Sequence, residues 1–183
     1  GNTLTSLDVV GKISDLSGTV GDIIIKDNIA KNVIIDISAG NANGSSIKGN
    51  KLNYTMTLDQ SPIRVATQFT RSIVKDNEFS TSVNQSVAPI TVAHTDFNNY
   101  GTYQIESNTV IAGIFSKALR ILNDSANVGI GLVLYAFNNK LTSNQIESSN
   151  PSRIYIKQWS ENKNGESNFP NSADNSQYMW KNM

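Results

Sequence analysis

The sequence has no cysteine and only one histidine. Without thiols the chain cannot form a disulfide, a thiolate metal site or a cysteine nucleophile. Fifteen basic and fifteen acidic residues cancel, so any contact with nucleic acid has to come from a local basic patch. No apolar run approaches the roughly 18 residues that cross a bilayer, and no signal peptide is visible at the N-terminus. These absences predict a protein with no cofactor, no bound metal and no membrane partner.

Charged residues are also scarce, at 16% of 183 residues, whereas soluble domains carry about 25%. Asparagine, serine and threonine take their place. Uncharged polar groups cost less to desolvate than charged ones, so such a surface suits a protein that is buried against its neighbours. We therefore expect a structural protein that assembles with copies of itself.

Alternating side chains predict β-strands over much of the first three-quarters of the chain. Residues 51–59 alternate most clearly, with one apolar face made of Leu52, Tyr54, Met56 and Leu58. The segment Ile63–Val74 follows after Ser61-Pro62 and is predicted to pair antiparallel with 51–59. Residues 3–14 and 19–27 predict an N-terminal hairpin, and residues 31–39 and 88–94 predict further strands.

The segment Glu106–Leu122 changes to a helical spacing. Its apolar residues recur at i, i+3, i+4 and i+7, with Ser107 or Asn108 as the N-cap. They are Ile111, Ile114, Phe115, Ala118, Leu119 and Leu122. An antiparallel sheet followed by this amphipathic helix predicts the α+β fold class.

The remainder of the chain is predicted to extend the main domain. Residues 126–140 are apolar on all sides and fit either a strand or a second helix, whereas residues 152–159 alternate like a strand. The last two dozen residues are rich in asparagine and serine. The sequence thus divides into a sheet-and-helix domain, 1–124, and an extension, 125–183, and we find no internal repeat.

Residues that would support catalysis are few. His94 ends a predicted strand, and no nucleophile-elbow motif accompanies it. The glycine-rich segment 40–50 lacks the spacing of a phosphate-binding loop. We therefore predict that the chain is not an enzyme and has no small-molecule substrate.

The polar face of residues 51–59 and its predicted neighbour strand carry basic and amide groups in a row. The row contains Lys51, Asn53, Thr55, Thr57, Arg64, Thr67 and Arg71. Such a face is able to contact phosphates and unstacked bases of RNA. An ordinary solvated outer face is the alternative interpretation.

In the order of its predicted elements the chain resembles the coat proteins of single-stranded RNA bacteriophages, the levivirus type. The similarity covers roughly residues 2–124: an opening hairpin at 2–27, a central hairpin at 51–74, a last strand at 89–97 and a helix at 106–122. In that family two chains interlock, with the helices of each crossing the sheet of its partner, and about ninety such dimers enclose genomic RNA.

The resemblance implies an icosahedral capsid protein that forms a homodimer and binds single-stranded RNA on its inner sheet face. The row from Lys51 to Arg71 would be that face, and the six apolar residues of the helix would form the dimer interface. The protein would be located in the virion, after assembly in the cytoplasm of the bacterial host.

Two other interpretations remain open. A fimbrial subunit, an incomplete sandwich completed by a strand of the next subunit, shares the polar, strand-rich composition. An enzyme or a lectin-type sandwich has only the aromatic residues Trp159, Tyr178 and Trp180 in its favour.

Overall fold

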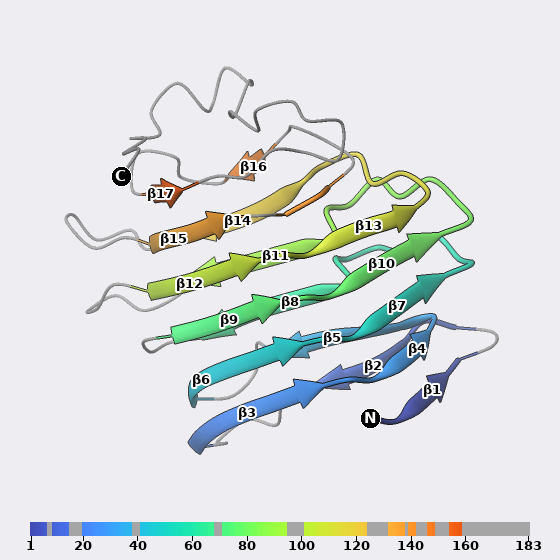
Figure 1. Ribbon diagram of the computed structural model, residues 1–183, viewed down its shortest axis with the longest axis horizontal. Helices are drawn as coiled ribbons and strands as arrows, with labels where there is room; N and C mark the ends of the chain where they lie inside the picture. The colour runs from blue at the N-terminus through green and yellow to red at the C-terminus, as the bar shows by residue number, and fades with distance from the viewer. Residues whose placement is uncertain are drawn as a thin grey trace.

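The computed structural model is built from parallel β-strands that wind into a stack of coils (Figure 1). It describes residues 1–6, 9–14, 20–37, 41–67, 71–94, 101–123, 132–137, 139–141, 146–148 and 154–158. Sheet A contains β1 (Thr3–Thr5), β4 (Ile29–Lys31), β7 (Lys51–Tyr54), β10 (Glu78–Thr81) and β13 (Thr109–Ala112). Sheet B contains β2 (Gly11–Ser14), β5 (Val33–Ile37), β8 (Ile63–Thr67), β11 (Ile90–His94), β14 (Leu119–Asn123) and β16 (Ile146–Ser148). Sheet C contains β3 (Val20–Lys26), β6 (Asn41–Lys48), β9 (Arg71–Lys75), β12 (Gly101–Glu106), β15 (Leu132–Phe137) and β17 (Ile154–Gln158).

Up to β13, successive strands enter the sheets in the repeating order A, B, C, whereas β14 to β17 belong to sheets B and C alone. In most of the stack every strand therefore pairs with the strand three places later in the sequence, as in β3–β6–β9–β12–β15. Sheets C and A follow one another along the front of the molecule in Figure 1, and sheet B runs behind them in the opposite direction. This is a parallel β-helix, a solenoid in which each coil contacts mainly its neighbours.

A ladder of asparagines marks the turn from sheet C into sheet A, which we call the asparagine corner. Its members are Asn2, Asn28, Asn50, Asn77, Asn108 and Asn139. In the interior coils the backbone N–H and Nδ2 of each asparagine donate to Oδ1 of the next, as Asn77 donates to Asn108 at 3.1 and 3.0 Å. From Asn50 onward, Nδ2 also donates to a carbonyl of the preceding coil, for example Asn77 to Ile47 at 3.0 Å. The ladder therefore satisfies polar groups that the closely stacked turns would otherwise leave unpaired.

The residue before each of Asn28, Asn50, Asn77 and Asn108 turns the chain through a left-handed backbone conformation. Asp27, Gly49, Asp76 and Ser107 have φ angles of 57°, 65°, 55° and 55°. Glycine adopts this conformation without steric cost, and aspartate tolerates it better than most other residues. A two-residue turn of the same shape is thus repeated from coil to coil.

The turns from sheet A into sheet B are less regular. Only Asn32 separates β4 from β5, whereas residues 55–62, 82–89 and 113–118 form loops in the later coils. Gln85 holds two of these loops together: its Oε1 accepts from the Leu58 N–H at 2.8 Å and its Nε2 donates to Met56 O at 2.8 Å. Phe79 of β10 and Phe115 of the loop 113–118 meet edge to face, with ring centroids 6.3 Å apart.

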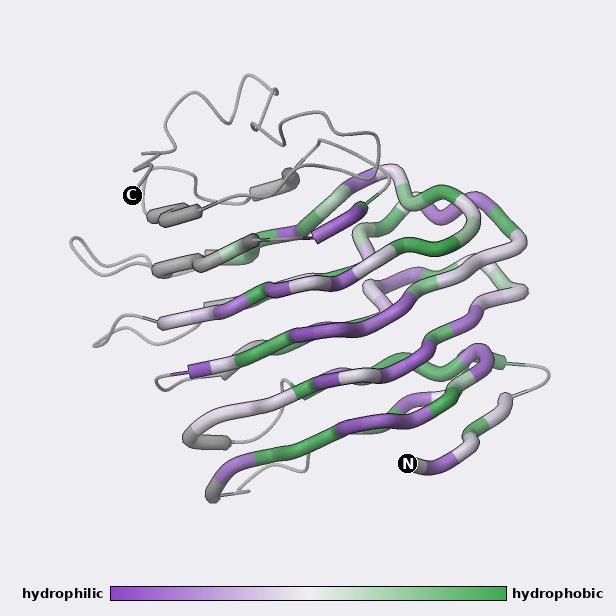
Figure 2. The backbone as a smooth tube through the Cα atoms, viewed as in Figure 1, coloured by the Kyte–Doolittle hydropathy of each residue, from purple (hydrophilic) through white to green (hydrophobic). Residues whose placement is uncertain are grey.

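The core fills the space between the three sheets. Hydrophobic stretches recur along the tube in successive coils (Figure 2), and their inward members are aliphatic, such as Ile35, Ile63 and Ile90. Two buried tyrosines satisfy their hydroxyls by donating 2.7 Å bonds, Tyr54 to Val33 O and Tyr103 to Ala93 O. Burial raises the pKa of the Tyr54 hydroxyl, so this group stays a neutral donor.

The α+β prediction is wrong, because the described part of the chain is all-β and its sheets are parallel. The segment predicted as a helix at 106–122 consists of the end of β12, then β13, a loop and β14. Its apparent helical period combines residues of three different pieces of structure: Ile111 lies on β13, Leu119 and Leu122 lie on β14, and Ile114, Phe115 and Ala118 belong to the loop 113–118. Gly113, with φ of 82°, interrupts the segment and lies against Thr81.

The predicted antiparallel hairpins are also wrong. Residues 63–74 divide into β8 in sheet B and β9 in sheet C, and β7 pairs in parallel with β4 and β10. Individual strands were predicted better: β3, β5, β11 and β17 fall within segments that the alternation marked as strands. Within 51–59, Leu52, Tyr54 and Leu58 are buried as predicted, but the strand ends at Tyr54.

The described part of the extension 125–183 continues the stack, since β15 pairs with β12 and β17 pairs with β15. Of the two readings of residues 126–140, the strand holds for Leu132–Phe137. The aromatic residues Trp159, Tyr178 and Trp180 lie outside the described residues. Among those that are described, no helix has the length and hydrophobicity needed to cross a membrane.

Candidate interaction surface

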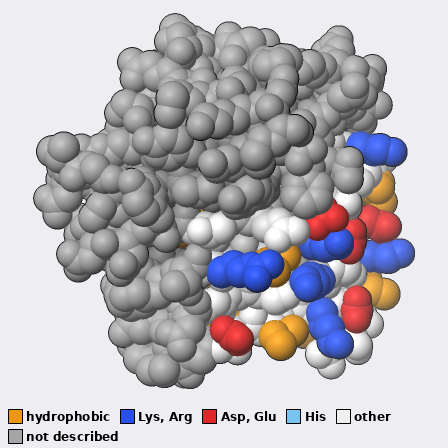
Figure 3. All heavy atoms as spheres, turned by 60° about the vertical axis from the view of Figure 1, so that its left-hand side comes forward, with side chains coloured by type: hydrophobic (Ala, Val, Ile, Leu, Met, Phe, Trp, Pro, Cys, Tyr) orange, Lys and Arg blue, Asp and Glu red, His pale blue; other side chains and the backbone are white. Residues whose placement is uncertain are grey.

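The outer face of sheet C is the most regular surface of the molecule. Alternation along each strand and the parallel register place its outward side chains in rows that cross the strands. From β3 to β12 these rows are Asp22–Gly44–Arg71–Thr102, Ile24–Ser46–Ile73–Gln104 and Lys26–Lys48–Lys75–Glu106. In the space-filling view, basic and acidic side chains are interspersed on the described part of the face shown (Figure 3).

The third row begins with three lysines and ends with an acid. Lys75 Nζ donates to Glu106 Oε1 at 2.9 Å, and this hydrogen bond raises the pKa of Lys75. Because the pKa is raised in the folded state, the pair stabilises the fold fully below the ordinary lysine pKa. Its contribution is lost only as the pH rises through the higher, folded value. The pair therefore stays intact through the neutral range.

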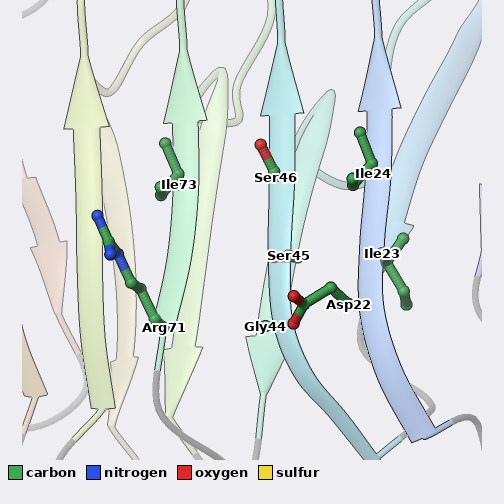
Figure 4. A pocket seen from close by; sticks show the side chains of 8 residues that line it. All are labelled: Asp22, Ile23, Ile24, Gly44, Ser45, Ser46, Arg71 and Ile73. Carbon is green, nitrogen blue, oxygen red and sulfur yellow. The ribbon is translucent and has the colours of Figure 1, made fainter.

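A shallow trough of about 440 Å³ crosses the first two rows, along β6 (Figure 4). Its floor is Gly44 and Ser46, and Ile24 and Ile73 form its two sides. A Cβ atom at Gly44 would lie 2.9 Å from Arg71 O and 3.1 Å from Asp22 Oδ1, so glycine keeps the floor open. The Asp22 carboxylate leans over Gly44, whereas Arg71 extends away from it toward β12.

Strand β3 is the N-terminal edge of sheet C, and no described strand pairs with its outer side. Its inward residues Ile23 and Ile25 are only partly buried, whereas Ile47 of the next coil is fully buried. Its outward Ile24 is 66% exposed. The first coil thus leaves both an apolar layer and a row of backbone hydrogen-bonding groups available to a partner.

Three of the five large hydrophobic side chains that the described residues expose belong to this first coil, and the other two are Ile111 and Ile114. Ile29, 57% exposed, occupies the position held by Lys51, Glu78 and Thr109 in successive coils. Val9, 69% exposed, precedes β2 in the same coil. Solenoids usually end in polar capping repeats, so an apolar terminal coil is typical of an interface.

The residues predicted to bind RNA do not form one row. Lys51 and Asn53 lie on sheet A and Thr55 and Thr57 in the following loop, whereas Arg64 and Thr67 belong to sheet B and Arg71 to sheet C. Two of the cations already form ion pairs. Lys51 lies 3.5 Å from Glu78. Arg64 lies 3.7 Å from the buried carboxylate of Asp36, which Lys12 also contacts. The described geometry therefore gives no single basic face that contains these residues.

The residues predicted to form a dimer interface divide into two groups. Phe115, Ala118 and Leu119 are buried in the core of their own chain, and Leu122 is partly buried. Ile111 and Ile114 are 60% and 55% exposed. Residues of the same chain already bury Phe115, Ala118 and Leu119, whereas a dimer interface at Ile111 and Ile114 stays a prediction.

The described residues contain no cluster of three or more acidic or histidine side chains that could hold a metal ion. His94 ends β11, where its register neighbours are Thr67 and Asn123. Comparison with protein-family models, with curated proteins and with solved structures finds no match to this chain.

Sequence reasoning missed both the coil and its open end, although a signal for the coil is present. From Asn28 onward, each ladder asparagine follows a strand of sheet C and precedes an alternating pair, as in Asn28-Ile-Ala, Asn50-Lys-Leu and Asn77-Glu-Phe. Successive ladder residues are 26, 22, 27, 31 and 31 positions apart. A search for a fixed period overlooks a repeat whose loops vary in length.

Proposed function

We propose that this chain is a non-catalytic structural protein that associates with further copies of itself through the open N-terminal end of its coil stack. The edge strand β3, whose outer side pairs with none of the described strands, is the observation that carries the proposal. An unprotected edge with apolar side chains is a template for pairing with another chain. Charged residues, proline and covering loops commonly block such edges, whereas the middle of β3 is Ile23-Ile24-Ile25.

Only part of the function implied by the phage-coat resemblance is carried into this proposal. Self-association is retained, but it is now supported by the exposed edge strand β3 and no longer by a helix. The resemblance depended on hairpins and a helix, and the described residues form parallel coils in their place. The fimbrial alternative requires a sandwich of antiparallel sheets, which the parallel sheets of the described residues do not provide. The icosahedral shell, the RNA cargo and the location in a virion stay predictions.

Sedimentation velocity over a dilution series of the full chain tests the proposal. We expect a species with twice the mass of the 19.9 kDa chain, or a larger one, that dissociates on dilution. Ile24→Lys should weaken this association, because it places a charge on the exposed edge. Ile111→Lys is the matched control, since Ile111 is similarly exposed but lies in an interior coil. A single-chain mass at every concentration would refute the proposal.

A further inference from the structure

Strand β3 has a charge pattern that is complementary to its own reverse. Its outward residues are Asp22, Ile24 and Lys26, and all three are exposed. The inward residues between them are Ile23 and Ile25. Reading the five residues backwards exchanges the acid for the base and leaves the isoleucines in place.

Resting on the self-association proposed above, we propose that two copies pair antiparallel along β3, with the two-fold axis at Ile24. Residues directly opposite each other in an antiparallel pair lie on the same face. Asp22 then faces Lys26 of the second copy, and Lys26 faces Asp22 of the second copy. Ile24 contacts Ile24 of the second copy on the outer face, and Ile23 meets Ile25 of the second copy on the inner face.

Other pairings of the same edge lack this complementarity. Moving the axis to Ile23 places Asp22 opposite Ile24 and Lys26 opposite Val20, so neither charge has a partner. A parallel pairing in register places Asp22 against Asp22 and Lys26 against Lys26, and like charges directly opposite each other are destabilising. The charges therefore favour one direction and one register.

This arrangement accounts for the exposed and half-buried side chains of β3. The two six-stranded C sheets become continuous through the pair, and the partly buried Ile23 and Ile25 gain apolar neighbours. The contact is isologous, so it closes on itself and leaves no free β3 edge for further growth. The ammonium of Lys26 from the second copy would also stand beside Asp22, at the side of the trough in Figure 4.

Charge reversal with complementation tests the register. Asp22→Lys alone places two lysine pairs across the axis, and Lys26→Asp alone places two aspartate pairs there. Each variant should dissociate roughly 10- to 100-fold more readily than the unmodified chain. An equimolar mixture of the two should restore a dimer, because one copy then supplies only lysines and the other only aspartates.

Two control variants carry the same changes of charge away from the edge. Lys140→Asp and Asp59→Lys alter exposed residues that are not on β3, and they should leave the dissociation constant unchanged. Far-UV circular dichroism and thermal melting of every variant check that the coil stack remains folded. Sedimentation equilibrium gives the dissociation constants, and the effect of charge reversal should shrink as salt is added.

The outcomes separate this inference from the proposed function. Monomeric single variants and a dimeric mixture support the Ile24-centred pair. A wild-type chain that associates while both single variants associate equally well overturns the register and leaves self-association standing. A wild-type chain that is monomeric throughout overturns both.

Discussion

The turn that leads into a strand of sheet A differs from the turn that leads out of it. At the asparagine corner the chain turns from sheet C to sheet A in the same way in successive coils, through one left-handed residue and one buried asparagine. On the opposite side the connection ranges from Asn32 alone to the loops 55–62 and 82–89. The comparison teaches that a repeated side-chain hydrogen bond fixes the spacing of the coils at one corner, which allows the other to vary.

The loop side substitutes individual contacts for the ladder. The side chain of Gln85 connects the loops 55–62 and 82–89, and its backbone pairs with Ile114 and Ser116 of the loop 113–118. Phe79 and Phe115 add an edge-to-face ring contact. At the corner each interior asparagine, such as Asn77, instead bonds to the coil before it and the coil after it. Substitutions at the two sides should therefore lower the free energy of unfolding by different amounts.

The largest effect is expected for Asn77→Ala at the middle of the ladder. The substitution removes the acceptor of the Asn50 N–H and the donor to Ile47 O, and both groups are buried. Since each buried group left unpaired costs about 1–3 kcal/mol, we expect a loss of about 3–5 kcal/mol in the free energy of unfolding. Urea denaturation followed by circular dichroism measures it.

Asn53→Ala is the matched control for that variant, because Asn53 is exposed on sheet A in a neighbouring coil. Its stability should stay within about 0.5 kcal/mol of the unmodified chain. Equal losses for the two asparagines would show that the ladder does not fix the corner.

A smaller loss is expected for Gln85→Ala on the loop side. The Leu58 N–H loses its acceptor, and the carbonyl of the half-buried Met56 loses its donor. The expected cost is about 2–3 kcal/mol, since at most two groups are left unpaired. Hydrogen exchange should show faster exchange at Leu58 while the Asn77 N–H stays protected. Simultaneous loss of protection at both would mean that the two sides are not independent.

The smallest effect is expected at the left-handed turn residue. Asp76→Val places a β-branched side chain at φ of 55°, which should cost about 1–2 kcal/mol. Asp76→Asn should be nearly neutral, because asparagine tolerates this conformation as aspartate does. Thermal melts of the two variants compare them directly. If the valine variant were as stable as the asparagine variant, the left-handed conformation at residue 76 would not contribute to the stability of the corner.

The sequence predicted strands better than their arrangement. Alternation marks Leu52 and Tyr54, or Ile90 and Val92, as inward residues whether their neighbour runs parallel or antiparallel. The relative direction of two strands depends instead on which distant strand supplies the hydrogen bonds. Lys51, for example, pairs with Ile29 and Glu78. Alternation within one strand carries no information about these pairings. The edge position of β3 follows from the same distant pairings, so the Asp22–Lys26 pattern acquires meaning only once the sheet order is known.

The doubly bonded asparagine column also bears on how the molecule responds to force. The Nδ2 groups of Asn50, Asn77 and Asn108 each donate to one coil back and one coil forward, so tension applied along the stack is shared by overlapping links. The first link differs, since Asn2 and Asn28 are joined only at 3.0 and 3.3 Å with no further carbonyl contact described for Asn28. Pulling should therefore peel the coils one after another from that margin, and a second copy seated there would raise the force at which peeling begins.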